Sequence, residues 1–146
     1  MRESVVIIGA GRSGRGMLGE LYYKDKARIT FADKDAGLTA GLRKQGYYTV
    51  KMSNMSSGES RETRVEGFQV LNTVTEHEAY IRSMCQADFI STALMPDAFD
   101  KVIGDLAEMI RMRMAAGNEK MLFITLGANY VGLYEYYDSG LRARLN

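Results

Sequence analysis

The sequence predicts an α/β fold in which helices cover a mostly parallel, doubly wound sheet, with a polar β-hairpin inserted near residues 47–66. Three observations support this prediction. Short apolar runs at 5–8 and 87–94 are typical of strands that are buried on both faces. Segments with a helical spacing of apolar residues separate these runs, as the connections of a parallel sheet require. A glycine-rich turn directly follows the first run.

The first predicted strand, Val5–Ile8, leads into the turn, where Gly9, Gly11 and Gly14 form the pattern G-x-G-x-x-G. Gly9 allows a tight turn, Gly11 leaves room for a pyrophosphate against the backbone, and Gly14 lets the next helix pack closely on the strand. The free N–H groups and partial positive charge at the start of that helix favour a phosphate anion. The pattern therefore predicts a phosphate site here.

A helical segment and a second strand, residues 28–32, separate this turn from Asp33. Asp33 lies about twenty residues past the glycines, where an acceptor for a ribose 2′-hydroxyl is expected. Together these features predict a dinucleotide site of the Rossmann type. The alternative is a turn that binds nothing, with Asp33 only capping the next helix. The apolar residues expected on the buried side of the first helix are Met17, Leu18, Leu21 and Tyr22.

The charge at Asp33 bears on which nicotinamide cofactor is preferred. A carboxylate meets the 2′-phosphate of NADP with like charge, so we expect NAD. Lys34 could soften this preference. Residues 35–46 are predicted to be helical and to end at Gly46.

Residues 47–66 depart from a minimal plan of alternating strands and helices. Segments 47–52 and 61–65 are predicted to pair as an antiparallel hairpin around a polar turn. We expect this hairpin to be solvated and to lie on the edge of the sheet. The alternative is a contact surface for a second domain.

The second half of the chain repeats the pattern of strands and helices. A short strand is expected at 67–71, a helix at 76–84 capped by Thr75 with Glu78 as its capping-box partner, and a fifth strand at 121–125. Because ligands of open α/β sheets lie outside the carboxyl ends of the strands, the loop formed by Thr92, Ala93 and Leu94 is a candidate wall of the cofactor site. Pro96 suits the first turn of the following helix.

The end of the chain has a tyrosine-rich helical pattern. Because no sixth strand follows it, its apolar side is expected to need a partner that is missing or belongs to another chain. The residues predicted to share this face are Tyr130, Tyr134, Tyr137, Leu141 and Leu145.

Composition limits the possible functions. The chain of 146 residues suits one domain, and its 19 basic and 18 acidic residues give a net charge of +1, which offers no electrostatic case for nucleic acid or an anionic membrane. The glycine motif begins soon after Met1, so no signal peptide is expected, and no apolar run is long enough to span a bilayer. The single cysteine, Cys85, is interpreted as a small buried hydrophobe and suits a reducing cytoplasm. His77, the only histidine, is interpreted as a surface residue, and no metal site or catalytic residue is assigned.

The form G-A-G-x-x-G-R-G, the segment Thr30-Phe31-Ala32-Asp33, the polar hairpin and the Asn129 segment give the chain a family resemblance. It resembles the amino-terminal NAD-binding domain of the long-chain polyol dehydrogenases, the family of mannitol-1-phosphate 5-dehydrogenase. The resemblance covers nearly the whole chain, from Gly9 to Asn129. Two positions depart from the family pattern, since Ala128 stands where a glutamate is usual and Gly132 where an arginine is common.

The resemblance implies an NAD site and a reaction. The cofactor-binding residues would be Gly9, Gly11, Arg12, Ser13, Gly14 and Arg15 at the pyrophosphate, Asp33 and the adjacent Lys34 at the adenosine ribose, Ala93 and Leu94 along the dinucleotide, and Asn129 near the nicotinamide. The reaction would be the oxidation of a polyol or polyol phosphate, as from mannitol 1-phosphate to fructose 6-phosphate. The carboxy-terminal catalytic domain of the family is absent, so residues 1–146 are expected to be a cofactor domain that needs that domain or a second chain.

Two other functions remain open at this point. One is a regulatory nucleotide-sensing module, because potassium-channel gating domains have a similar length and glycine turn, although they usually lack the intervening hairpin. The other is a Rossmann-like domain for an unrelated ligand such as a methyl donor, which Asp33 would also accommodate.

Overall fold

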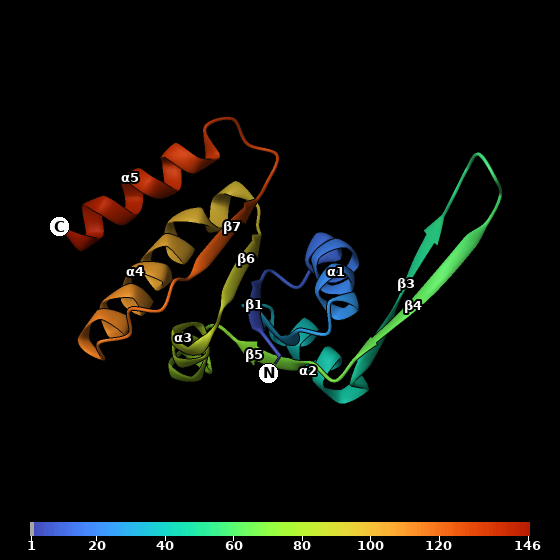
Figure 1. Cartoon of the computed structure of the whole chain (residues 1–146), viewed down its shortest axis with the longest axis horizontal. Helices are drawn as coiled ribbons and strands as arrows, with labels where there is room; N and C mark the ends of the chain where they lie inside the picture. The colour runs from blue at the N-terminus through green and yellow to red at the C-terminus, as the bar shows by residue number, and fades with distance from the viewer. Residues whose placement is uncertain (1) are drawn as a thin grey trace.

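The computed structural model describes residues 2–146 and has a five-stranded parallel sheet in the order β5-β2-β1-β6-β7 (Figure 1). This confirms the predicted α/β class. The order places β1 between β2 and β6, so β1 is the central strand. The strands are β1 Ser4–Ile8, β2 Arg28–Asp33, β5 Gln69–Asn72, β6 Phe89–Ala93 and β7 Phe123–Gly127.

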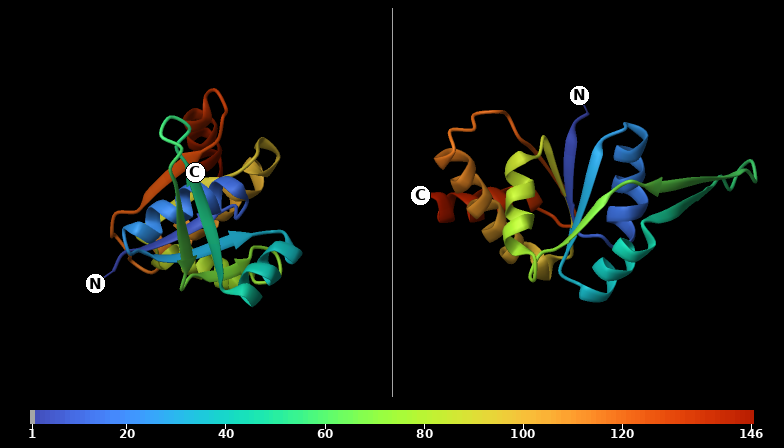
Figure 2. Two further views of the ribbon diagram at one scale, coloured as in Figure 1. Left: turned by 90° about the vertical axis from the view of Figure 1, so that its right-hand side faces the viewer. Right: turned by 90° about the horizontal axis from the view of Figure 1, so that it is seen from below.

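Helices cover both faces of this sheet, as Figure 2 shows. The helix after the glycine turn and α2 lie on one face, and α3, α4 and α5 lie on the other. Side chains of β1 serve both layers in alternation, since Val5 and Ile7 join one apolar cluster and Val6 and Ile8 join the other. The helical segments are η1 Gly14–Gly19, α1 Glu20–Lys24, α2 Ala36–Gln45, α3 His77–Gln86, η2 Pro96–Ala98, α4 Phe99–Ala115 and α5 Leu133–Leu145.

The register of the strands brings several loops to one edge of the sheet. Ile8 at the end of β1 lies between Ala32 of β2 and Thr92 of β6. Asp33 at the end of β2 pairs with Asn72 at the end of β5. Loops that are far apart in the sequence therefore meet where the predicted cofactor site was expected.

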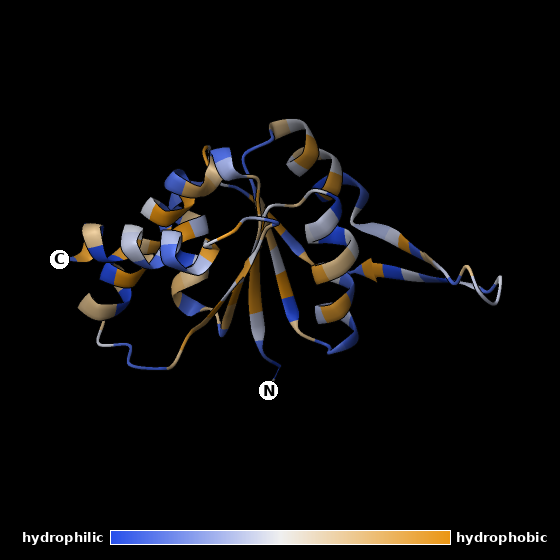
Figure 3. Cartoon of the chain, turned by 90° about the horizontal axis from the view of Figure 1, so that it is seen from above, coloured by the Kyte–Doolittle hydropathy of each residue, from blue (hydrophilic) through white to orange (hydrophobic). Residues whose placement is uncertain are grey.

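The predicted hairpin is present, but its place differs from the prediction. Strands β3 Tyr47–Ser53 and β4 Ser60–Glu66 form a separate two-stranded sheet that projects away from the body of the molecule (Figure 3). It does not extend the edge of the parallel sheet, which ends at β5 on that side.

The base of the hairpin is buried rather than solvated, which explains its position. Tyr48 and Val65 belong to the same apolar cluster as Phe31 of β2. The Tyr48 hydroxyl donates a hydrogen bond to the Arg15 carbonyl (2.7 Å). The hairpin thus packs through apolar side chains on one face against β2 and the helix that follows the glycine turn. Its strands form no backbone hydrogen-bond ladder with the parallel sheet.

The helix after the glycine turn buries a narrower stripe than the sequence predicts. It includes a π-helical segment, η1, and packs through Leu18 and Tyr22. The expected partners Met17 and Leu21 are 62% and 57% exposed, so that part of the prediction is wrong. The buried side of the helix includes Gly14 and Gly19, where an added Cβ would lie 1.8 Å from the Gly9 carbonyl oxygen and 2.1 Å from the Tyr48 hydroxyl oxygen.

The carboxy-terminal helix also differs from the prediction. α5 packs on α4 of the same chain, with Leu133, Tyr137 and Leu141 in the shared apolar cluster, so its buried side does not need a missing partner (Figure 1). Tyr137 is only 3% exposed and its ring centroid lies 5.5 Å from that of Phe99. Tyr134, predicted on the same face, is 67% exposed, because the buried stripe follows a spacing of four residues.

Other boundaries also differ from the prediction. β5 begins at Gln69 and β7 at Phe123, each two residues later than expected. α3 begins at His77 and has no side-chain cap, and Glu78 is paired with Arg82 instead of closing a capping box with Thr75. The backbone N–H of Thr75 is bonded to the side chain of Asn72, which belongs to the site described below.

Candidate functional site

A cavity of about 360 Å³ opens at the carboxyl ends of β1, β2 and β6. Open α/β sheets bind their ligands at this edge, at the point where the order of the strands reverses. The cavity has an apolar floor that includes Ile8 and Ala32. The sequence-predicted residues that it brings together are Gly9, Gly11, Asp33, Lys34, Ala93 and Leu94.

Gly9 and Gly14 are required by packing. Gly9 has a φ of 100°, and a Cβ there would lie 2.3 Å from the Ala93 carbonyl oxygen. Gly14 is buried, and its Cβ would meet the Gly9 carbonyl oxygen. The end of β1 is therefore wedged between the end of β6 and the start of the helix, as the two glycine roles predict.

Gly11 is different, because no packing contact requires it. It is exposed, and no atom of the described residues lies within 4 Å of the position that a Cβ would take. The first intrahelical bond nearby joins the Arg15 N–H to the Gly11 carbonyl (3.0 Å). The N–H groups ahead of that bond belong to the open first turn of a helix, which has no intrahelical acceptor for them. This part of the turn can receive an anion.

Other predicted residues lie outside the cavity lining. Arg12 and Ser13 are exposed in the first helical turn. The Arg15 Nε donates to the Gly11 carbonyl (3.4 Å), so its guanidinium lies along the turn. Asn129 is exposed, two residues after the end of β7. Gly14 lies beneath the turn rather than in the cavity.

Asp33 is held by two backbone donors. One carboxylate oxygen accepts the Ala10 N–H (2.8 Å), and the other accepts the Asp35 N–H (2.9 Å). Asp33 does not cap α2; that cap is Asp35, whose side chain accepts the Leu38 N–H (2.9 Å). A carboxylate offers about four lone-pair sites, so Asp33 keeps acceptors for a ligand while its position is fixed against the glycine turn.

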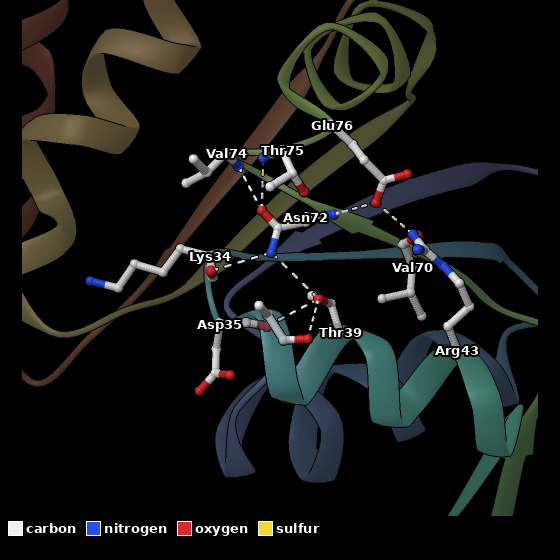
Figure 4. Close-up of polar contacts among 10 residues, drawn as sticks. Lys34, Asp35, Thr39, Arg43, Val70, Asn72, Val74, Thr75 and Glu76 are labelled. Carbon is white, nitrogen blue, oxygen red and sulfur yellow. Dashed lines mark hydrogen bonds and ion pairs between the residues drawn. The ribbon is translucent and has the colours of Figure 1, made fainter.

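A single buried amide joins the two loops beside Asp33 (Figure 4). Asn72 is 5% exposed, and its Nδ2 donates to the Lys34 carbonyl (3.3 Å) and to the Thr39 hydroxyl (3.4 Å). Its Oδ1 accepts the N–H groups of Val74 (2.9 Å) and Thr75 (3.0 Å). Lys34 and Val74 both line the cavity, so Asn72 sets the distance between two of its walls.

A charged pair supports the same amide from behind (Figure 4). The Asn72 N–H donates to Glu76 Oε1 (3.0 Å), and Arg43 Nη2 donates to the same oxygen (2.6 Å) and to the Val70 carbonyl (2.5 Å). The hydrogen bond from Arg43 lowers the pKa of Glu76 below its ordinary value, with help from the Asn72 N–H. Glu76 therefore remains an acceptor at neutral pH.

Sequence reasoning missed the far wall of the cavity. Thr73, Val74, Lys101 and Asp105 line it, and none of them was predicted. Asp105 is only 4% exposed and accepts hydrogen bonds from the Tyr80 hydroxyl (3.1 Å) and from Lys101 Nζ (2.5 Å). The signal that could have found it is a carboxylate at a position of the apolar stripe of α4, where an unneeded charge would be costly.

His77 lies partly exposed at the surface, as interpreted from the sequence, and both of its ring nitrogens have partners there. Its Nδ1 is 3.1 Å from the Thr73 carbonyl, and its Nε2 is 3.0 Å from Glu108 Oε2. The hydrogen bond with Glu108 raises the pKa of His77 above its ordinary value. Polar atoms of His77, Asp105 and Glu108 lie within 4.8 Å of one another, but Lys101 already neutralises Asp105, so we assign no metal site there.

Within residues 2–146, no helix combines the length and the hydropathy needed to cross a membrane. The fold also has a solved counterpart. A glycerol-3-phosphate dehydrogenase from Coxiella burnetii superposes with a TM-score of 0.61 at 15% identity, over 96% of this chain and 38% of that protein. At this identity the likeness concerns the fold alone.

Sequence relatives are closer. A mannitol-1-phosphate 5-dehydrogenase from Enterococcus faecalis is 30% identical over 129 residues, which cover 88% of this chain and 33% of the relative. The same enzyme from Lacticaseibacillus casei is 28% identical over 141 residues, which cover 91% of this chain and 36% of the relative. The chain thus spans about a third of the length of these curated relatives.

A family match covers most of the chain. Residues 3–132 match the mannitol dehydrogenase Rossmann domain. This match includes the glycine turn, Asp33 and the hairpin, and it favours the dehydrogenase interpretation over the regulatory module. Domains of this kind serve a nucleotide cofactor. The chain therefore belongs to the mannitol dehydrogenase Rossmann-domain family.

Proposed function

We propose that residues 1–146 form the NAD(H)-binding domain of an oxidoreductase that acts on a polyol or a polyol phosphate. The observation that carries this proposal is the open space at Gly11 beside the fixed carboxylate of Asp33, at the edge of the sheet where dinucleotides bind. A methyl group at residue 11 would fill space that packing leaves empty. A pyrophosphate fits this cradle, because backbone N–H groups at the start of a helix attract anions.

The residues around the cavity are proposed to divide the dinucleotide among them. Gly9, Gly11 and the first helical turn at Arg12 and Ser13 would hold the pyrophosphate, with Arg15 beside it. Asp33 would accept a hydrogen bond from the adenosine ribose, and its charge would disfavour the 2′-phosphate of NADP. Ala93 and Leu94 would lie along the dinucleotide, with Asn129 toward the nicotinamide and Lys34 near the ribose.

NAD would supply the hydride acceptor for the oxidation of a secondary alcohol. The described residues would bind and orient it, and we assign none of them a catalytic role. The relatives are named mannitol-1-phosphate 5-dehydrogenase and are about three times as long as this chain. We therefore propose that the substrate site and the catalytic groups belong to a carboxy-terminal domain or a second chain. We also propose that the complete enzyme works in the cytoplasm.

A fluorescence titration with NADH tests the proposal. We expect saturable binding and no turnover of mannitol 1-phosphate by this chain alone. Asp33→Asn should reduce the preference for NADH over NADPH, because it removes the charge that repels the 2′-phosphate. Asp35→Asn is the matched control, since asparagine also caps helices well and residue 35 does not line the cavity.

Failure of the folded protein to bind NADH at millimolar concentration would remove the proposal. Competition by S-adenosylmethionine with higher affinity than NAD would favour the methyl-donor alternative instead. An octameric ring in solution would favour the regulatory alternative.

A further inference from the structure

The cavity contains a buried carboxylate that the proposed contacts with pyrophosphate and ribose leave without a role. Asp105 lies in the apolar stripe of α4, at 4% exposure, and still lines the cavity. Burying a carboxylate is costly unless it is hydrogen-bonded and paired, and Asp105 has both Tyr80 and Lys101 for this purpose. The carboxylate thus accepts a hydrogen bond from the hydroxyl of the buried Tyr80, and it also reaches the cavity, where a structural acceptor alone would not need to lie.

The position of Asp105 relative to the rest of the cavity indicates what it faces. The glycine turn and η1 lie on one face of the sheet, while α4 lies on the other. A dinucleotide with its pyrophosphate at Gly11 and its ribose at Asp33 would direct its base away from the pyrophosphate. Val74, Val102 and Asp105 line the same cavity as Gly11 and Asp33, so we infer that the base lies against them. This inference rests on the proposed dinucleotide site.

The chemistry of that wall suits an adenine ring. Val74 and Val102 offer apolar surface for a flat ring, and Asp105 offers only acceptors. Tyr80 and Lys101 use two of its roughly four lone-pair sites. We propose that Asp105 accepts a hydrogen bond from the 6-amino group of the adenine and so selects adenine dinucleotides against those with a 6-oxo base.

A base with a 6-oxo group reverses this contact. Hypoxanthine would place a carbonyl oxygen against the carboxylate, where neither partner can donate. A site built to receive a donor rejects an analogue that lacks it, because its own buried group is left unpaired. Lys101 offers a donor nearby, but its ammonium is already bonded to Asp105.

Binding of NAD and of nicotinamide hypoxanthine dinucleotide to this chain, measured by calorimetry, tests the inference. We expect the hypoxanthine analogue to bind roughly tenfold or more weakly, as for loss of a hydrogen bond to a charged group. Asp105→Asn should abolish most of this difference, because an amide can turn its donor toward the 6-oxo group. Tyr80→Phe is the matched control, since it removes another partner of the same carboxylate from outside the cavity lining and should keep the difference.

The outcomes separate this inference from the proposed function. Equal affinity of the wild-type chain for the two dinucleotides would overturn the role of Asp105 and leave the NAD site intact. Binding of neither would overturn both. Thermal unfolding checks that Asp105→Asn is folded; if it is not, the comparison of the two dinucleotides on the wild-type chain decides alone.

Discussion

One methyl group added at two glycines of the same turn is expected to have different consequences. At Gly14 the new Cβ would lie 1.8 Å from the Gly9 carbonyl oxygen and 3.0 Å from its carbon. Both are backbone atoms, so the turn itself must move. At Gly11 no atom of the described residues lies within 4 Å of the new Cβ. Gly14→Ala should therefore damage the fold, and Gly11→Ala should damage only the site.

The magnitudes follow from these contacts. Overpacking of a well-packed region costs about 3 kcal/mol at the upper end of its usual range, and replacing a helical glycine by alanine recovers about 1 kcal/mol. We expect Gly14→Ala to lose about 2 kcal/mol of unfolding free energy, which for a domain of this size is roughly 4–8 °C in Tm. Gly11→Ala should change the unfolding free energy by about 0.5 kcal/mol or less. Its affinity for NADH should fall roughly tenfold or more, or about 1.4 kcal/mol.

Thermal unfolding followed by circular dichroism and a fluorescence titration with NADH measure the two effects separately. Gly16→Ala is the control, because residue 16 lies in the same helix and a Cβ there also meets no atom within 4 Å. It should keep NADH binding, and its unfolding free energy should stay the same or rise by up to about 1 kcal/mol. If Gly11→Ala binds NADH as tightly as the wild type, the cradle is in the wrong place. If Gly14→Ala is as stable as the wild type, the packing argument fails.

Two further predictions concern side chains around the cavity. Asn72→Ala should lower the unfolding free energy in urea by about 2–3 kcal/mol, because it removes the partner of three part-buried backbone groups at roughly 1 kcal/mol each. It should also weaken NADH binding. Thr39→Val, which removes one partner of the amide, should have a smaller effect on both. The pKa of His77 is raised in the folded state, so its stabilising effect is complete below about pH 6.5 and is lost as the pH rises through the raised value. Tm measured against pH should show this loss, with a modest size because His77 is partly exposed, and Glu108→Gln should flatten it; an unchanged profile in that variant would contradict the pairing.

Local patterns were enough to predict the central part of the fold. The run of β-branched residues in β1, the spacing of Gly9, Gly11 and Gly14, and the acid at the end of β2 each reflect a constraint within one βαβ unit. Such constraints act over a short stretch of chain, so they are visible in sequence. The same holds for the left-handed Gly46, which ends α2 with a φ of 74°.

The errors concern contacts between distant segments. The alternation in residues 47–66 predicts a hairpin, but only the contacts of Tyr48 with Phe31 and the Arg15 carbonyl determine where it packs. The predicted buried face of α5 included Tyr134, which is exposed. The sequence does not show that Tyr137, and not Tyr134, packs against Phe99 of α4. The sequence pattern of an element therefore predicts which side is apolar, but the packing partner determines which of those side chains are buried.

Two residues of the site were not predicted for a similar reason. Asn72 and Asp105 are polar residues at positions that the pattern assigns to a strand end and to an apolar helical stripe. Neither is predicted as a site residue, because neither has an obvious role within its own element. Asn72 connects the loops after β2 and β5 through its side-chain hydrogen bonds. Asp105 lines the cavity. A buried polar residue that its own element does not explain is therefore the more informative sign of a site.

The glycine turn makes the same distinction within a single motif. Packing requires glycine at positions 9 and 14, since a Cβ at either one would meet a backbone carbonyl oxygen. A domain that bound nothing would still need both of them to bring β1, β6 and η1 together. Gly11 has neither a crowded neighbour nor a left-handed backbone, yet it lies on the cavity. Its small size is thus unexplained by the fold, and the space that it leaves free is the part of the motif that indicates a ligand.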